Sequence, residues 1–135
     1  MSIDNVKTIQ ETYQAFGAGD VAAIQARCTP DTRWGFAAAY PEAVSWHRPV
    51  EGRDGLPRFF GDIGQAVEFQ AFELREFVHC GPHVLVEVHL AYTVRATGAK
   101  VEMDQVHWWT LDPDGRIANM RHFEDSAQVL QAVAA

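Results

Sequence analysis

Two strands joined by a tight turn are predicted in the last third of the chain, and this hairpin constrains the fold more than any other stretch. Its turn is Asp112-Pro113-Asp114-Gly115, with alternating apolar residues on both sides. An Asp-Gly pair between such stretches is among the strongest hairpin signals. Because side chains alternate between the faces of a strand, the second strand groups Met120, His122 and Glu124. If His107 on the first strand shares that face, two imidazoles and a carboxylate meet there.

The composition is that of an ordinary folded protein. The 135 residues suit one domain, residues 1–135, of which 47% are hydrophobic and 21% charged, as in soluble globular chains. The net charge of −7 argues against a nucleic-acid partner, because phosphate binding requires a basic surface. No apolar run approaches the roughly 20 residues of a membrane span, so no membrane partner is expected.

The cysteines and the first residues indicate the compartment. Cys28 and Cys80 are isolated and lack metal-ligand spacing, which is typical of free, buried cysteines in a reducing environment. The chain does not start with basic residues followed by an apolar core, so no secretion signal is predicted. We therefore expect a cytoplasmic protein.

The first thirty residues predict two helices. Apolar side chains spaced three or four apart predict a helix over residues 4–16, with Ser2 or Asp4 available as its N-cap. Asp20 then caps a shorter helix that Pro30 ends.

The rest of the chain predicts one more early helix, a set of strands and a last helix. A strand over 32–36 is followed by a long irregular connection, residues 37–52, and by a third helix that residues 52–55 introduce. Further strands are predicted over 67–79, 84–97, 100–111 and 116–124, and Asp125 caps the last helix. This order predicts an α+β fold with helices on one face of a curved sheet.

Three motifs carry a resemblance to a known superfamily. They are residues 13–20, which end one helix and start the next, residues 52–55 before Phe59-Phe60, and residues 114–117 before Arg121, Phe123 and Asp125. With these motifs and this element order, nearly the whole chain resembles the nuclear-transport-factor-2-like superfamily, in particular its SnoaL-like and ketosteroid-isomerase-related branch.

That resemblance implies a cone-shaped, cystatin-like α+β fold. A curved antiparallel sheet and three N-terminal helices would enclose a hydrophobic pocket, with a short C-terminal helix after them. Members of the superfamily commonly form homodimers through the outer face of the sheet. Their pockets serve isomerases, cyclases, dehydratases, epoxide hydrolases and binding proteins, so the fold alone does not select an activity.

The resemblance to ketosteroid isomerases can be followed residue by residue. Phe36 falls at the position of their general-base aspartate, and Thr12 falls at that of their oxyanion-hole tyrosine. His107 takes the position of their protonated aspartate. Steroid isomerisation by that mechanism is therefore not expected, although the comparison does predict that His107 faces the pocket.

The expected site combines a small polar group with a largely apolar wall. His107, His122 and Glu124 are the candidate catalytic residues, because a carboxylate within hydrogen-bond reach of a histidine orients it and raises its basicity. The expected ligand-contacting residues are Trp34, Phe36, Trp46, His47, Phe60, Ile63, Leu90, Tyr92, Met103, Gln105, Trp109 and Met120.

Other readings of these residues stay open. The two histidines and Glu124 can also form a structural polar network, or bind a ligand without catalysis. Two imidazoles and a carboxylate are also a common metal-ligand set, although the chain has no HExxH or similar short-spaced motif. Trp46 and His47 can belong to a mobile lid within residues 37–52, or the indole can cover a sheet edge.

Four charged residues have alternative interpretations. Arg95, Asp104 and Arg121 resemble fragments of the Asp-Arg-Asp arrangement of epoxide hydrolases in this superfamily, but strand alternation turns Asp104 and Arg121 outward. We interpret them as a charge pair on the surface or at a dimer interface. Asp125 is interpreted as a helix N-cap rather than as a catalytic acid.

These expectations define a cytoplasmic homodimer that binds a small, largely apolar organic molecule and needs no cofactor. As an enzyme it would carry out isomerisation, dehydration or cyclisation. His107 would move the proton, and Glu124 would orient the His107 ring. His122 or Tyr92 would bind the substrate oxygen. The competing reading is a binding or accessory protein without catalysis.

Overall fold

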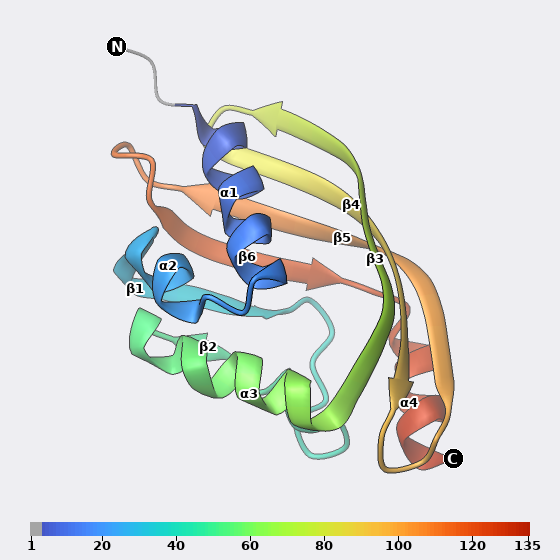
Figure 1. Cartoon of the computed structure of the whole chain (residues 1–135). Coiled ribbons are helices and arrows are strands. Elements are labelled where there is room, and N and C mark those ends of the chain that lie inside the picture. Colours follow the sequence, from blue (N-terminus) through green and yellow to red (C-terminus); the bar gives the residue numbers. More distant parts are fainter. Residues whose placement is uncertain (1–3) are drawn as a thin grey trace.

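A computed structural model describes residues 4–135 as four α-helices and a six-stranded sheet. The sheet is curved, and α1, α2 and α3 lie on its concave side, while α4 lies at the far end of the strands (Figure 1). The helices are α1 (Asn5–Gly17), α2 (Val21–Ala26), α3 (Leu56–Ala66) and α4 (Ser126–Ala134), with 3-10 turns η1 (Ser45–His47) and η2 (Arg53–Gly55). None of the helices described is long and apolar enough to cross a membrane.

The strands run in the order β2-β1-β6-β5-β4-β3 across the sheet. Their bounds are β1 (Cys28–Phe36), β2 (Val50–Glu51), β3 (Val67–Cys80), β4 (His83–Val94), β5 (Lys100–Leu111) and β6 (Ile117–Phe123). The four strands β3 to β6 pair in antiparallel fashion, as the sequence predicts, whereas β1 lies parallel to β6. The order of helices and strands therefore agrees with the prediction, with β2 as an additional short strand.

Local signals in the sequence position most element boundaries. The Asp4 and Asp20 side chains accept hydrogen bonds from the backbone N–H of Lys7 and Ala23, and so cap α1 and α2. Ser2, the other candidate cap, lies outside the described residues. The second helix ends at Ala26, before Pro30, which instead lies within β1 where its register with β6 shifts. Proline is tolerated at such irregular positions of a strand.

The predicted hairpin turn forms between β5 and β6. The Asp112 carboxylate accepts hydrogen bonds from the backbone N–H groups of Asp114 and Arg116, at 3.0 and 2.9 Å. Gly115 takes a φ of +80°, a conformation that favours glycine. The turn therefore holds β5 and β6 in the register that positions the candidate site.

Alternation along β4 and β5 also agrees with the prediction. Val88, Leu90 and Tyr92 are buried on β4, and Gln105 and His107 are buried on β5. The register between β4 and β5 is continuous from His83–Thr110 to Thr93–Lys100, without a bulge. Because nothing interrupts the two-residue period here, His107 faces the concave side, beneath the helices.

Asp125 caps the last helix. Its carboxylate accepts a hydrogen bond from the backbone N–H of Gln128 at 3.2 Å. Gln128 in turn accepts a hydrogen bond from the backbone N–H of Glu102 at 2.9 Å, which ties the start of α4 to β5. The capping interpretation of Asp125 thus accounts for its position.

Candidate functional site

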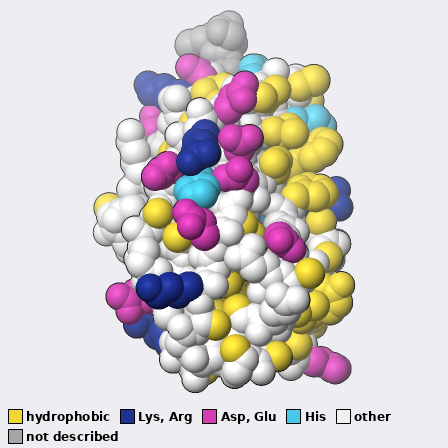
Figure 2. Space-filling view, turned by 90° about the vertical axis from the view of Figure 1, so that its right-hand side faces the viewer, with side chains coloured by type: hydrophobic (Ala, Val, Ile, Leu, Met, Phe, Trp, Pro, Cys, Tyr) yellow, Lys and Arg dark blue, Asp and Glu magenta, His cyan; other side chains and the backbone are white. Residues whose placement is uncertain are grey.

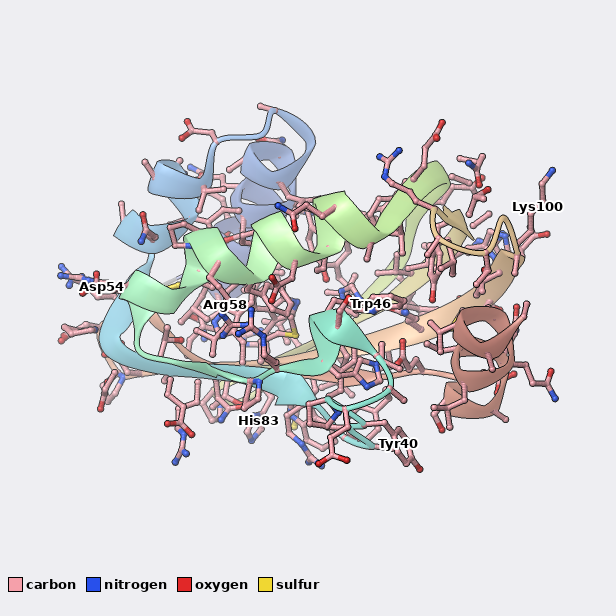
Figure 3. All side chains as sticks on the ribbon, turned by 90° about the horizontal axis from the view of Figure 1, so that it is seen from below. Tyr40, Trp46, Asp54, Arg58, His83 and Lys100 are labelled. Atoms are coloured by element: carbon pink, nitrogen blue, oxygen red, sulfur yellow. The ribbon has the colours of Figure 1, made fainter. Side chains whose placement is uncertain are left out.

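A cavity of about 80 Å³ is lined by residues of the sheet and of helices α1 and α3. Trp46, from the long connection after β1, lies between α3 and the sheet (Figure 3). A second cavity of about 230 Å³ adjoins the first, beside exposed residues of α3 and of the α1–α2 turn. The two cavities share the lining residues Phe16, Ile24, Phe60, Ile63 and Phe69. We call them the inner and the outer cavity.

Aromatic rings form most of the inner wall. The rings of Trp34 and Trp109 meet edge to face with centroids 5.1 Å apart, and Trp34 also meets Phe59 and Phe60 at 5.9 Å. Phe36 stacks on His122 at 4.3 Å. Such ring pairs contribute packing energy beyond their buried area, so contacts between rings stabilise this part of the wall.

A chain of hydrogen bonds runs along one side of this wall. The indole N–H of Trp109 donates to the Tyr13 hydroxyl at 3.0 Å, and that hydroxyl lies 2.7 Å from Nδ1 of His107. Nε2 of His107 lies 2.9 Å from the side-chain oxygen of Gln105. The amide oxygen can only accept, so Nε2 carries the proton. Nδ1 of the neutral ring is then the acceptor, and Tyr13 donates to it.

The chain continues to Glu124. The Gln105 amide N–H donates to Oε1 of Glu124 at 3.2 Å, and Nε2 of His47 lies 2.8 Å from Oε2. The backbone N–H of Tyr40 donates to Nδ1 of His47 at 3.0 Å. That contact leaves no room for a proton on Nδ1, so His47 is neutral and donates through Nε2.

In both branches of this hydrogen-bond chain, each group donates to the next one toward Glu124. One branch starts at Trp109 and the other at Tyr40. The carboxyl group accepts at both oxygens, as an acceptor-only carboxylate does, and the surrounding imidazoles are neutral. Burial lowers the pKa of His107 well below its ordinary value, and the neighbouring His122 lowers it further. Burial likewise raises the pKa of the Tyr13 hydroxyl, so it remains a donor at neutral pH.

Two polar groups of the inner cavity have no partner among the described residues. They are the hydroxyl of Tyr92 and Nδ1 of His122, on side chains of residues that are 4% and 8% exposed. Burial lowers the pKa of His122 to about 4, while the nearby backbone of Gly35 acts on this pKa in the opposite direction. Burial and the charge of Glu124 raise the pKa of Tyr92. Buried polar groups usually have a hydrogen-bond partner, so these two require an explanation.

The expected direct contact between His107 and Glu124 is absent, and this prediction was wrong. Register gives the reason: His107 lies opposite His122, and Val106 lies opposite Phe123. Glu124 therefore falls at the level of Gln105, which connects it to His107. The imidazole that contacts the carboxylate directly is His47, which comes from a loop without periodicity.

Most of the predicted ligand-contacting residues do line the inner cavity. The candidate catalytic residues His107, His122 and Glu124 line it together with Trp34, Phe36, Trp46, Phe60, Ile63, Leu90, Tyr92, Gln105, Trp109 and Met120. His47 and Met103 do not line it. His47 stacks behind Phe36 at 4.2 Å, and the sulfur of Met103 lies 3.8 Å from the Gln105 amide.

His47 is also not a lid residue in this structure. It is buried, both of its ring nitrogens have partners, and its neighbour Trp46 is buried against Tyr92. Tyr13, by contrast, lies in the cavity wall although its helical spacing predicts only a core position. Its contact with His107 joins residues 94 positions apart, which no local pattern reveals.

The remaining charged candidates lie outside the cavity and do not pair with one another. Asp104 contacts His89 at 2.7 Å, Arg95 contacts Glu68 at 3.5 Å, and the Arg121 guanidinium lies 4.9 Å from the centre of the Phe123 ring. Asp104 and Arg121 therefore do not pair with each other within one chain, and the alternative, a pair at a dimer interface, stays a prediction. Within residues 4–135, no group of three or more His, Cys, Asp or Glu side chains is arranged to hold a metal ion.

Two tyrosine-to-phenylalanine substitutions separate the partnered hydroxyl from the unpartnered one. Tyr13→Phe leaves the Trp109 indole N–H and Nδ1 of His107 without a partner, and should lower the free energy of unfolding by about 1–3 kcal/mol. Tyr92→Phe removes a hydroxyl that has no partner. It should leave the free energy of unfolding unchanged or raise it slightly. Urea unfolding of both variants tests this, and equal losses would contradict the assigned hydrogen bonds.

The comparison with protein families places the chain in a class. The family model of the SnoaL-like domain matches residues 9–120. The chain therefore belongs to the SnoaL-like family, the branch that the sequence motifs indicate. Among curated proteins, no sequence matches this chain.

Solved structures agree on the fold. An NTF2-like protein of unknown function from Burkholderia pseudomallei K96243 superposes with a TM-score of 0.85 at 22% identity, over 99% of this chain and 100% of that one. TerC, co-crystallised with polyporic acid, superposes with a TM-score of 0.83 at 22% identity, over 97% of this chain and 98% of that one. An LEH-like epoxide hydrolase from M. tuberculosis superposes with a TM-score of 0.71 at 17% identity, over 96% of this chain and 89% of that one. At these identities the likeness concerns the fold.

Proposed function

We propose that this protein binds a small, largely apolar, ring-containing organic molecule in the inner cavity. The observation that carries the proposal is the pair of buried, unpartnered polar groups, the Tyr92 hydroxyl and Nδ1 of His122, on residues of a largely apolar wall. Ligand sites typically combine apolar walls with a few such polar groups. A ligand oxygen or nitrogen would supply the missing hydrogen bonds, while its ring would pack on Trp34 and Phe36.

The size of the cavities limits the ligand. The inner cavity of about 80 Å³ is smaller than the roughly 300 Å³ at the lower end of small-molecule sites. A ligand larger than a single ring must therefore extend into the outer cavity, past Phe16, Phe60 and Phe69. TerC, of similar fold, has been co-crystallised with polyporic acid, which supports an organic ligand for this chain as well.

Tryptophan signals provide a direct test of binding. Trp34, Trp46 and Trp109 line the inner cavity, whereas Trp108 lies beside His83 on the other face of β5. We expect benzyl alcohol to shift the indole ¹H–¹⁵N NMR signals of the first three and to leave the Trp108 signal unchanged. A Trp108→Phe variant identifies the control signal. Unchanged signals for the three cavity tryptophans would contradict the proposal.

A pair of glycine variants tests the route of entry. Gly64 lines the outer cavity and Gly61 lies outside both cavities, while both are exposed on α3 and have open space at the Cβ position. Gly64→Leu should weaken binding of a bicyclic probe such as 2-naphthol about tenfold or more, because the new side chain occupies the outer cavity. Gly61→Leu changes the same helix and should leave binding unchanged. Equal affinities in the two variants would contradict entry by this route.

A second candidate function is acid/base catalysis without a cofactor, of the isomerase, dehydratase or cyclase type. His122 favours it, because this residue lines the cavity and Nδ1 of its neutral ring is buried without a partner. We propose that it takes a proton from a carbon next to a carbonyl while Tyr92 donates to the enolate oxygen. His107, with both nitrogens occupied by Tyr13 and Gln105, would hold the Glu124 end of the wall in place.

Deuterium exchange measures this activity without a known substrate. In D₂O, His122 would remove a methyl proton of acetophenone and the enolate would take a deuteron from the solvent, which ¹H NMR detects as loss of the methyl signal. General-base catalysis typically contributes about 10²–10⁴-fold, so His122→Phe should slow enzyme-dependent exchange about 100-fold. Tyr92→Phe should slow it less. If acetophenone binds but never exchanges, the protein is a binding protein for this ligand.

We also propose a cytoplasmic homodimer that forms through the outer face of the sheet. Acidic, basic and histidine side chains gather on the side of the molecule formed by the curved strands, with hydrophobic side chains beside them (Figure 2). On this face His89 lies between Glu102 and Asp104 at 2.9 and 2.7 Å. Sedimentation velocity tests the assembly state, and a monomer at micromolar concentration would contradict the proposal.

A further inference from the structure

The inner cavity holds one negative charge that no basic side chain neutralises. Glu124 accepts hydrogen bonds from His47 and Gln105 at both carboxylate oxygens, and its side chain is 3% exposed. Within residues 4–135, no Lys or Arg nitrogen lies within 4.0 Å of it. Its two donors are neutral. The Gln105 side chain is an uncharged amide, and His47 is neutral because its Nδ1 accepts a hydrogen bond from the backbone N–H of Tyr40. The remaining polar groups of the wall are neutral as well.

The carboxylate can still accept hydrogen bonds from a ligand. An ionised carboxylate offers about four acceptor positions, and the protein occupies only two of them in the described contacts. Glu124 lines the cavity alongside Tyr92 and His122, whose polar atoms lack partners. A ligand in this cavity therefore faces a wall that contains one charged acceptor and two neutral polar groups without partners.

We infer that Glu124 sets the chemical class of the ligand: a ring compound that is neutral or cationic and carries an O–H or N–H donor, and not a carboxylate or another anion. The inference rests on the proposed binding function, which it makes more specific. A donor on the ligand gains a charge-assisted hydrogen bond to Glu124. An anion in the same place is repelled by a charge that solvent screens poorly.

The aromatic wall is consistent with this class. The rings of Phe36, Trp34 and Tyr92 line the same cavity as Glu124. The faces of aromatic rings carry partial negative charge, which favours ammonium groups and disfavours anions. The aromatic wall and the carboxylate therefore both favour a neutral or cationic ligand over an anion. Among residues 4–135, no arginine or lysine lines the cavity to offset this preference.

Three probes of nearly equal shape test the inference at neutral pH. Benzamide carries N–H donors and no charge, benzoate is its anionic counterpart, and toluene has neither donor nor charge. Titrations followed by the indole signals of Trp34, Trp46 and Trp109 report occupancy of the cavity. We expect benzamide to bind at least about 30-fold more tightly than benzoate, since repulsion of unit charges a few ångströms apart near a protein interior exceeds this factor. Toluene should fall between them.

A charge-neutral variant and a matched control identify the responsible residue. Glu124→Gln keeps the shape of the side chain and should reduce the ratio of benzamide to benzoate affinity at least about tenfold. Glu87→Gln removes the same charge from an exposed position on β4 and should leave the ratio unchanged. The comparison of probes on the unaltered protein stands even if Glu124→Gln fails to fold.

The outcomes distinguish the inference from the function on which it rests. If benzamide and benzoate shift the same tryptophan signals with equal affinity, the protein binds ring compounds but the assigned selectivity is overturned. If no probe shifts these signals, the proposed function itself fails and the inference falls with it. Selective binding of benzamide that Glu124→Gln removes supports both.

Discussion

Acidification from pH 6.5 to 4 is expected to lower the free energy of unfolding by about 3 kcal/mol through His122 alone, given its ordinary pKa of 6.5 and its value of about 4 in the folded protein. The unfolded chain takes up the proton first as the pH falls, so acid favours unfolding. Below about pH 4 the folded protein is protonated too, and the loss levels off. His107, whose pKa burial also lowers, adds to the loss in the same direction.

Urea unfolding at a series of pH values measures this loss. A His122→Phe variant should keep the stacking on Phe36 and lose less stability than the unaltered protein between pH 6.5 and 4. His79→Ala, which removes an exposed imidazole at the end of β3, is the matched control. If His122→Phe and the unaltered protein show the same slope, His122 is not buried as a neutral ring.

Phe59→Ala is expected to destabilise the protein by about 3–5 kcal/mol, the usual cost of deleting a buried aromatic side chain. Phe59 is 1% exposed, and its ring meets those of Trp34, Phe60 and His122 at 5.9, 5.3 and 6.1 Å. Its removal would both lose these contacts and enlarge the inner cavity. The enlarged cavity should bind benzene, which would restore part of the stability by mass action.

The loss of stability should depend on how deeply the phenylalanine is buried in the wall, because the same substitution removes the same side chain at both positions. Phe69→Ala removes the same side chain from a residue that is 37% exposed on β3, and should cost about 1 kcal/mol or less. Urea unfolding with and without benzene compares the two variants. Similar losses, or a Phe59→Ala protein that benzene does not stabilise, would show that Phe59 does not support the cavity.

Local rules predict most of the fold because each acts over a few residues. The Asp-Gly turn at residues 112–115, the caps at Asp20 and Asp125, and the two-residue period of β4 and β5 each fix an element or a face without reference to distant parts of the chain. The parallel pairing of β1 with β6 is different, because it joins residues about ninety positions apart in the sequence. No local pattern specifies it.

The candidate site was predictable to the level of faces but not of contacts. Alternation places His107, His122 and Glu124 on the concave side, yet only the register of the hairpin decides that Gln105 separates His107 from Glu124. The bond between His47 and Glu124 depends on the path of an irregular connection, which has no period. The face on which a side chain lies can therefore be predicted from the period of its own strand. Its contacts also depend on the register between two strands and on the path of the loop beside them.

The curvature of the sheet has a consequence for self-association. Strand β3 forms one edge of the sheet and exposes Leu74 and Val78, which would make a long, flat edge prone to aggregation. Its register with β4 shifts twice, between Phe69 and Ala71 and between Leu74 and Glu76. Bulges increase local twist and interrupt the row of free backbone groups. The irregularities that bend the strand around the cavity therefore also protect its open edge from pairing with another chain.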